Sequence, residues 1–161
     1  MNSGQMLLVL FGMIIFGMLS LNVYKSSSSR EDTLRTNEAF LNATGLAQSM
    51  INEIESKAFD QNTVHKAATS ADSLTSPDLL GSDAGETSAT QFNDIDDYNN
   101  YITTDSLSRL GVYTVGVKVY YIQNMSPDVK SNVQTFSKQV DVSVTNFCLP
   151  DTLKLSRVIT Y

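Results

Sequence analysis

The densest run of side chains that could bind a metal lies at residues 93–100, Asn-Asp-Ile-Asp-Asp-Tyr-Asn-Asn. Ca²⁺ binds about six to eight oxygen atoms, taken from carboxylates, amides and carbonyls. Four side chains of this run could supply such oxygens: Asp94, Asp96, Asp97 and Asn99. The spacing is not that of an EF-hand, whose loop glycine and final glutamate are missing here. The run therefore predicts one of two things, a calcium site or a solvated acidic loop held down by its aromatic residues.

The remaining reactive residue types form no recognisable catalytic set. His65 is the one histidine of the chain, and no nucleophile or carboxylate stands at a known catalytic spacing from it. The sequence has no Gly-x-Ser-x-Gly, no phosphate-binding glycine loop and no Cys/His zinc spacing. Cys148 is the one cysteine, so an internal disulfide is impossible, and we expect it to be buried and inert. We predict that the protein is not an enzyme and that calcium is the one conceivable cofactor.

The net charge and the length of the chain limit the classes of function that the protein could have. The chain has 161 residues and a net charge of −6, which argues against nucleic-acid binding because that function needs basic patches. The length fits one domain plus an N-terminal apolar segment. We expect the segment boundaries at 1–24 for the apolar helix, 25–59 for its amphipathic continuation, 60–108 for a long loop and 109–161 for a sheet.

The N-terminal segment is long enough to cross a bilayer. Residues 1–24 carry no charged side chain, and Lys25 is the first charged residue. About 20 helical residues span about 30 Å, the thickness of a hydrocarbon core. A cleaved secretory signal is disfavoured, because the start has no basic residue and the first alanine is Ala39. Two alternatives stay open: a simple membrane anchor, or a helix that first sits in a membrane and later packs against copies of itself.

An amphipathic helix is predicted to follow the apolar segment. Apolar residues between 34 and 58 recur at spacings close to three and four, which favours one apolar helix face. The residues of this face are Leu34, Phe40, Ala43, Ala47, Met50 or Ile51, Ile54 and Ala58. If the two segments join, one helix runs from about residue 5 to 59, a length of about 80 Å. A small domain cannot bury such a helix, so half of it needs packing partners elsewhere.

The rest of the chain predicts a loop followed by strands, and the fold class is α+β. Turn residues fill 60–108, and we expect a compact loop anchored by Phe92, Ile95, Tyr98, Tyr101 and Ile102. Alternating apolar residues predict strands at 112–123, 134–146 and 152–161. Short connections favour an antiparallel sheet of about three to four strands. Its apolar face needs a cover, which the stripe at 34–58 can provide.

This layout resembles the type IV pilin and pseudopilin family. The resemblance rests on a very short polar start that ends in Gly4, an uncharged apolar helix, its amphipathic continuation, and a C-terminal sheet reached through a long loop. The layout covers the whole chain, whereas sequence-level similarity is confined to about the first 25 residues.

The resemblance implies how the N-terminus is processed. Family members usually have a glycine before the cleavage point, an N-methylated residue after it, and a glutamate at the fifth mature position. Two alignments to this pattern are possible. In the first, Gly4 precedes the cleavage point and Gln5 is the first mature residue. In the second, Met1 is already the mature start, and Gln5 stands where the family has its glutamate. Neither alignment supplies the glutamate. An amide there still accepts a hydrogen bond, and it avoids burying an unpaired carboxylate.

The resemblance also implies assembly through the apolar helix. The expected filament-core residues are Gln5, Leu7, Leu8, Leu10, Phe11, Ile14, Ile15 and Phe16. Four small or polar residues interrupt the run of large apolar side chains in this helix: Gly12, Gly17, Ser20 and Asn22. They either let neighbouring helices approach closely, or they mark a segment that unwinds on assembly. We expect a structural subunit of an extracellular, type IV pilus-like filament. Its expected partners are copies of itself, the inner membrane before assembly, and the assembly machinery. The alternatives are a pseudopilin of a secretion system and a single-pass envelope binding protein that never polymerises.

Overall fold

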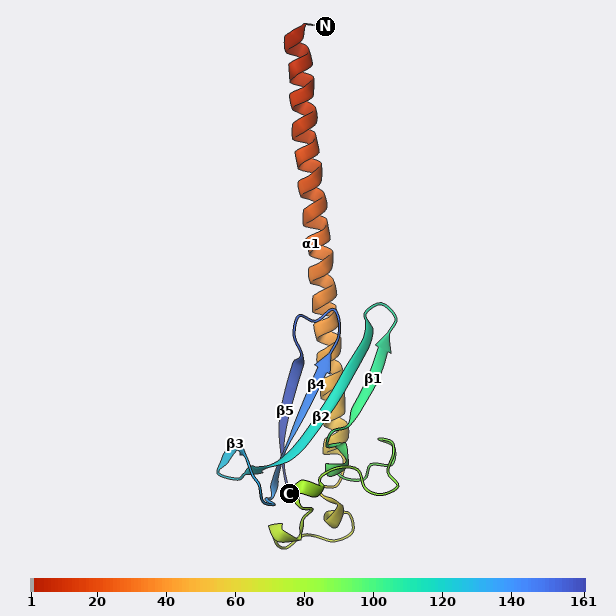
Figure 1. Cartoon of the computed structure of the whole chain (residues 1–161), viewed down its shortest axis with the longest axis vertical. Coiled ribbons are helices and arrows are strands. Elements are labelled where there is room, and N and C mark those ends of the chain that lie inside the picture. Colours follow the sequence, from red (N-terminus) through yellow and green to blue (C-terminus); the bar gives the residue numbers. More distant parts are fainter. Residues whose placement is uncertain (1) are drawn as a thin grey trace. The chain divides into compact units, whose positions relative to one another are not determined.

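The computed structural model describes residues 2–161 and has an α+β fold (Figure 1). A helix is followed by four short 3₁₀ helices and five strands: α1 (Ser3–Glu55), η1 (Gln61–Thr63), η2 (Ala71–Ser73), η3 (Pro77–Leu79), η4 (Asp96–Tyr98), β1 (Ile102–Leu107), β2 (Gly111–Gln123), β3 (Ser126–Lys130), β4 (Ser137–Thr145) and β5 (Leu153–Thr160). The chain divides into two compact units, one ending at Glu38 and the other formed by Ala39–Tyr161.

The first unit is helical from Ser3 to its end at Glu38, and this part of the chain is the first part of α1. Residues 2–35 are all exposed. The helix is long and apolar enough to cross a membrane by its length and composition, and none of its most apolar window is buried within the structure. The prediction of an uninterrupted helix from the apolar segment onward is therefore confirmed, with an end at Glu55 rather than at residue 59.

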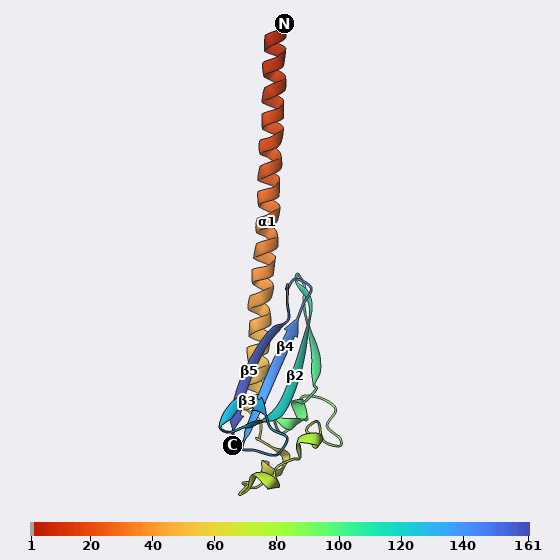
Figure 2. The same cartoon turned by 60° about the vertical axis from the view of Figure 1, so that its left-hand side comes forward.

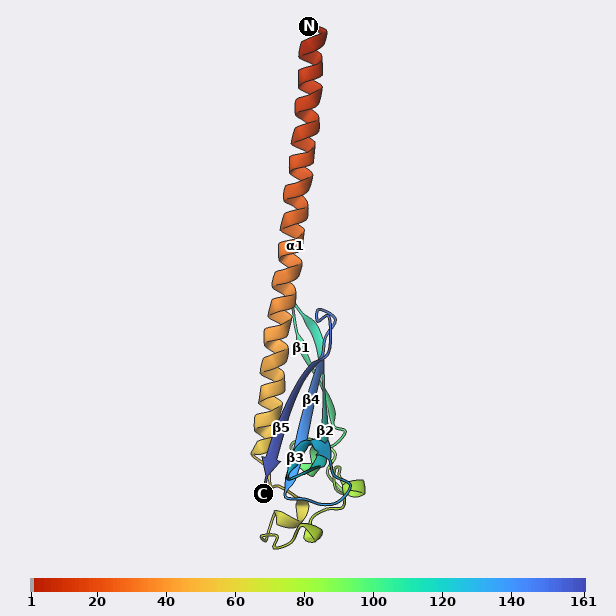
Figure 3. The same cartoon turned by 90° about the vertical axis from the view of Figure 1, so that its left-hand side faces the viewer.

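The second unit begins with the last turns of α1, which lie along one face of the sheet (Figure 3). The buried residues of this part of the helix are Ala39, Ala43, Ala47, Ile51 and Ile54. The predicted stripe is thus correct from Ala43 to Ile54 and wrong at Leu34 and Phe40, both of which are exposed. Its last member, Ala58, lies beyond the end of the helix and is half-buried. Small residues let the helix backbone approach the sheet closely, so Ala39 fills the contact and the neighbouring Phe40 points away.

The sheet is antiparallel, with the strand order β1-β2-β4-β5, and β3 pairs with the end of β2. The structure has five strands, one or two more than the three to four predicted from the sequence. Strand β1 lies inside the predicted loop 60–108, and β3 lies in the connection between the predicted strands 112–123 and 134–146. Every residue of β3 and most of β1 are exposed, so neither strand has the buried alternation that identifies a strand in a sequence.

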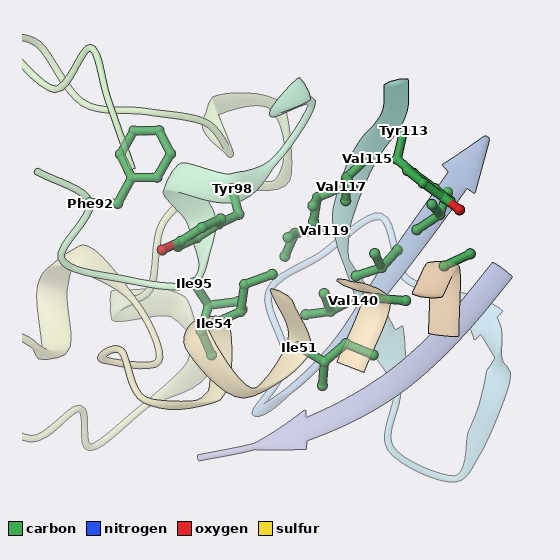
Figure 4. Close-up of a cluster of buried hydrophobic side chains, with 14 of the residues drawn as sticks. Ile51, Ile54, Phe92, Ile95, Tyr98, Tyr113, Val115, Val117, Val119 and Val140 are labelled. Carbon is green, nitrogen blue, oxygen red and sulfur yellow. The ribbon is translucent and has the colours of Figure 1, made fainter. Parts of the chain in front are cut away.

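The core lies between α1 and the sheet (Figure 4). On β2 the alternating apolar residues are all buried: Tyr113, Val115, Val117, Val119 and Tyr121. On β4, Val140, Val142 and Val144 are buried in the same alternating way, and Phe136 lies half-buried just before the strand. Figure 4 shows Ile51 and Ile54 of α1 directed toward Val140 and Ile95.

The segment between α1 and β1 is compact and packs at one end of the second unit, as predicted (Figure 2). Phe92, Tyr98 and Tyr101 form three mutual edge-to-face contacts, with ring centroids 5.0–5.9 Å apart. Ile95 is also buried, but Ile102 is exposed, so that anchor is wrong. Ile102 lies on the edge strand β1, where its side chain has no neighbouring strand beyond it.

Candidate functional site

Two regions of the chain are candidates for function. The first is the exposed apolar part of α1. Its predicted filament-core residues Leu7, Leu8, Leu10, Phe11, Ile14, Ile15 and Phe16 are 44–73% exposed. Exposed apolar area on this scale is typical of a membrane or protein contact.

The predicted processing and unwinding residues lie in the same helix. Gly4 and Gln5 are helical and exposed, and so are Gly12, Gly17, Ser20 and Asn22. A Cβ atom added at Gly12 or Gly17 would meet nothing within 4 Å, so neither glycine is required by a contact within this chain. The alternative mature start at Met1 lies outside the described residues.

The second region is the acidic run at 93–100, which is buried rather than solvated. Asp94, Asp96 and Asp97 are only 1%, 2% and 3% exposed. The expectation of a solvated acidic loop is therefore wrong, although the aromatic anchors beside it are mostly right. A buried carboxylate needs hydrogen-bond donors or a cation, so each of the three requires a partner.

Backbone amides donate to one oxygen of each of two of these carboxylates. Oδ1 of Asp94 accepts hydrogen bonds from the amides of Asp96 and Asp97, at 2.8 and 3.2 Å. Oδ2 of Asp97 accepts from the amides of Asn93 and Asp94, at 2.9 and 3.2 Å. These bonds fold residues 93–97 into a tight turn that leads into η4.

Asn99 serves a different purpose from the predicted one. Its amide group donates to the Leu80 carbonyl at 2.9 Å, and its oxygen accepts from the Val119 amide at 3.1 Å. Asn99 therefore joins the loop to β2 instead of facing the three aspartates as a ligand.

Asp96 pairs with Lys138, a residue that no motif in the sequence marks as functional. Lys138, on β4, is completely buried and its ammonium lies 2.5 Å from Oδ1 of Asp96. It also donates to Oδ2 of Asp60 at 2.9 Å and to the Phe59 carbonyl at 2.8 Å. Two rings flank the ammonium, with centroids 4.5 Å away for Phe59 and 4.9 Å away for Tyr121. We call Lys138, Asp60 and Asp96 the buried charge cluster.

Asp60 is more fully hydrogen-bonded than Asp96. Its Oδ1 accepts from the amide of Asn62 and from the amide and hydroxyl of Thr75. Its Oδ2 accepts from the Thr75 amide and from Lys138, and the Tyr121 hydroxyl lies 3.1 Å away. By contrast, Oδ2 of Asp96 is buried and has no hydrogen-bond partner among the described residues.

These contacts give the carboxyl groups of Asp60, Asp94 and Asp96 different pKa values. Burial acts to raise the pKa of Asp60, but Lys138 and the bonds from Thr75 and Asn62 hold it below its ordinary value. Burial raises the pKa of Asp96 to about 8, with Asp94 adding to the effect and Lys138 opposing it. Burial and the Asp97 carboxylate raise the pKa of Asp94 to about 7. The cluster thus holds one cation, one carboxylate that stays ionised and one carboxyl that retains a proton near neutral pH.

A separate acidic group includes only one of the predicted calcium ligands. Carboxylate oxygens of Asp83, Glu86 and Asp97 lie within 4.8 Å of one another. Burial and the neighbouring Asp97 raise the pKa of Glu86. Asp94 and Asp96 are not members of this group, so the predicted set of four does not converge on one point. Calcium binding at 93–100 stays a prediction.

The other residues considered in the sequence lie outside both regions. His65 is exposed, as expected for a histidine with no catalytic partner. Cys148 is half-buried and forms no disulfide.

Comparison of the chain with models of protein families, with curated proteins and with solved structures finds no match. A proposal for its function therefore depends on the residues and their geometry.

Proposed function

We propose that this protein is the structural subunit of a type IV pilus-like extracellular filament, assembled through the apolar half of α1. The observation that carries the proposal is the contrast within one helix. The turns from Ala39 to Ile54 bury their apolar stripe against the sheet, whereas the apolar residues from Met6 to Tyr24 are all exposed.

Exposed residues of this kind need another environment. A bilayer provides one before assembly, because the helix is long and apolar enough to span it. Copies of the same helix provide the other, since van der Waals packing and small residues such as Gly12 and Gly17 allow helices to approach. The proposed location is the inner membrane first and the cell surface afterwards. The proposed partners are further copies of the chain and the machinery that extracts it from the membrane.

The resemblance to pilins supports the same proposal through layout. A long helix, a compact loop and a C-terminal antiparallel sheet follow one another in the order that the family uses. A pseudopilin of a secretion system would share this layout. A pilus subunit and a pseudopilin differ in the length of the filament that they form, and both functions require assembly through α1.

Ile14→Asp tests the proposal. Ile14 lies near the middle of the apolar segment and is 56% exposed. Exchanging Ile for Asp at the centre of a membrane helix costs about 3–4 kcal/mol on insertion scales. In a filament, the aspartate of every subunit would be buried in the apolar core at a comparable cost in free energy. We therefore expect electron microscopy of the sheared surface fraction to show no filaments.

Two controls make the test specific. Val133→Asp makes a similar change at an exposed residue of the second unit, and we expect it to leave filaments intact. If Ile14→Asp is absent from the membrane fraction, the milder Phe11→Ala is used to weaken packing without adding a charge. Normal filaments from an Ile14→Asp protein that is present in the membrane would refute assembly through this segment.

A further inference from the structure

The buried charge cluster has an arrangement that goes beyond an ion pair. An ammonium and two carboxyls are enclosed together, with exposed fractions of 0% for Lys138, 0% for Asp60 and 2% for Asp96. Packing holds them in contact, because Lys138 is fixed on β4 between two aromatic rings. A nucleophile and a carbonyl carbon kept together in this way react with an effective concentration far above that in solution.

The two carboxyls are not equivalent. Asp60 accepts from Asn62, Thr75 and Lys138, and these donors favour its ionised form. Asp96 accepts from Lys138 through one oxygen, and its other oxygen is buried without a partner among the residues described. Environments that separate two carboxyls in this way assign one as proton acceptor and the other as the neutral acid.

We propose that the side chains of Lys138 and Asp96 join in an amide bond within the chain, with Asp60 as the proton acceptor. The short contact between the Lys138 nitrogen and Asp96 is then the encounter that precedes bond formation. This modification would link β4 to η4 and does not depend on the filament proposal.

The reaction balances without any further reactant. The Lys138 ammonium transfers one proton to the Asp60 carboxylate, and the nitrogen lone pair then forms a bond to Cγ of protonated Asp96. The bond from Cγ to the hydroxyl oxygen breaks. The hydroxyl leaves as water with a second proton from the nitrogen, and the third hydrogen remains on the amide. No electron is gained or lost, so neither an oxidant nor a reductant is needed.

The surroundings favour the product. Bond formation replaces the buried ammonium, the Asp96 carboxyl and the Asp60 carboxylate by a neutral amide and a protonated Asp60, which removes the cost of desolvating two charges. The amide nitrogen keeps one hydrogen, which the Phe59 carbonyl or Asp60 can accept. The bond also closes a covalent loop between positions 96 and 138, which restricts the unfolded chain.

Peptide mapping of the full-length chain tests the proposal. The protein is extracted from membranes, denatured and digested with trypsin. With the amide bond present, trypsin cannot cleave after Lys138, and a branched product joins residues 67–109 to residues 131–154. Its mass is lower than the sum of the two peptides by one water. We expect this branched product in the wild type, and finding only separate peptides cut after Lys138 would overturn the proposal.

Three variants establish the chemistry. Lys138→Arg keeps a cation that does not attack carbonyls, so the branched product must disappear. Lys130→Arg makes the same exchange at an exposed lysine, and the product must remain. Asp60→Asn removes the proton acceptor, and we expect the branched product to accumulate at least tenfold more slowly after synthesis. A branched product that persists in Lys138→Arg would show that another residue forms the link and would refute the assignment.

Discussion

Asp94→Asn should change how the stability of the second unit depends on pH. The substitution keeps the shape of the side chain and its Oδ1, which accepts from the amides of Asp96 and Asp97. It removes a titrating group whose other oxygen is buried without a partner among the described residues. The charge of Asp97 raises the pKa of Asp94, and the charge of Lys138 opposes this effect.

The direction follows from proton binding in the two states. Burial and the Asp97 carboxylate raise the pKa of Asp94 from 3.8 to about 7, so the folded state binds more protons than the unfolded state between these values. The contribution of Asp94 to the free energy of unfolding must therefore fall as the pH rises from about 4 to about 7. Each pKa unit corresponds to about 1.4 kcal/mol, so the full difference is about 4 kcal/mol.

Urea unfolding in detergent at a series of pH values measures this difference. The chain has no tryptophan, so the near-ultraviolet circular dichroism of the buried tyrosines Tyr98, Tyr113 and Tyr121 reports on the second unit. We expect the advantage in stability of Asp94→Asn over the wild type to grow as the pH rises from about 4 to about 7, and to level off above 7. Loss of the Asp94 charge also lowers the pKa of Asp96, which changes stability in the same direction.

The matched control is Asp128→Asn, at an exposed position of β3. It should unfold with the pH dependence of the wild type. If Asp94→Asn shows the same slope of unfolding free energy against pH as the wild type, the carboxyl at position 94 is ionised throughout, and the reasoning from burial is wrong.

Two further predictions concern the faces of α1 and use the same unfolding measurement. Gly45→Ala should stabilise the second unit by about 1 kcal/mol, because Gly45 is exposed in a helix interior and an added Cβ meets nothing within 4 Å; a loss of stability would contradict this. Ala43→Leu should destabilise it by about 1–3 kcal/mol, because Ala43 is completely buried where the helix packs on the sheet and extra methylene groups overfill a packed core. An unchanged midpoint for Ala43→Leu would show that this contact is loosely packed.

Regular patterns in the sequence predicted the main elements of the fold. The long uncharged segment and the stripe from Ala43 to Ile54 identified α1, and alternation identified β2 and β4. The edge strands β1 and β3 were missed because their residues are exposed and have no alternating pattern. Phe40 was wrongly predicted to face the sheet, because a search for apolar periodicity favours the most hydrophobic residue at each turn. In the structure, the small alanine side chains make the contact with the sheet instead.

The buried charge cluster could not be predicted from spacing. Its members come from three separate parts of the chain, and Lys138 stands at an inward position of β4, where charged residues are rare. One signal was present in the sequence. Lys138 falls in the alternating run 134–146 in phase with Val140, Val142 and Val144, so a strict alternation would have placed it inside. An inward lysine requires buried carboxylates, and the acidic run at 93–100 supplies one.

The buried charge cluster also affects the order in which the chain folds. Lys138 contacts residues that are 78 and 42 positions earlier in the sequence. Contacts at such separations form slowly, because a long loop must close before they contribute any stability. During synthesis Asp60 and Asp96 leave the ribosome well before β4, so they remain hydrated and without their cation until the last third of the chain is available. The second unit therefore completes its core only after β4 has been made, when the apolar segment of α1 has long been synthesised and has had time to enter a membrane.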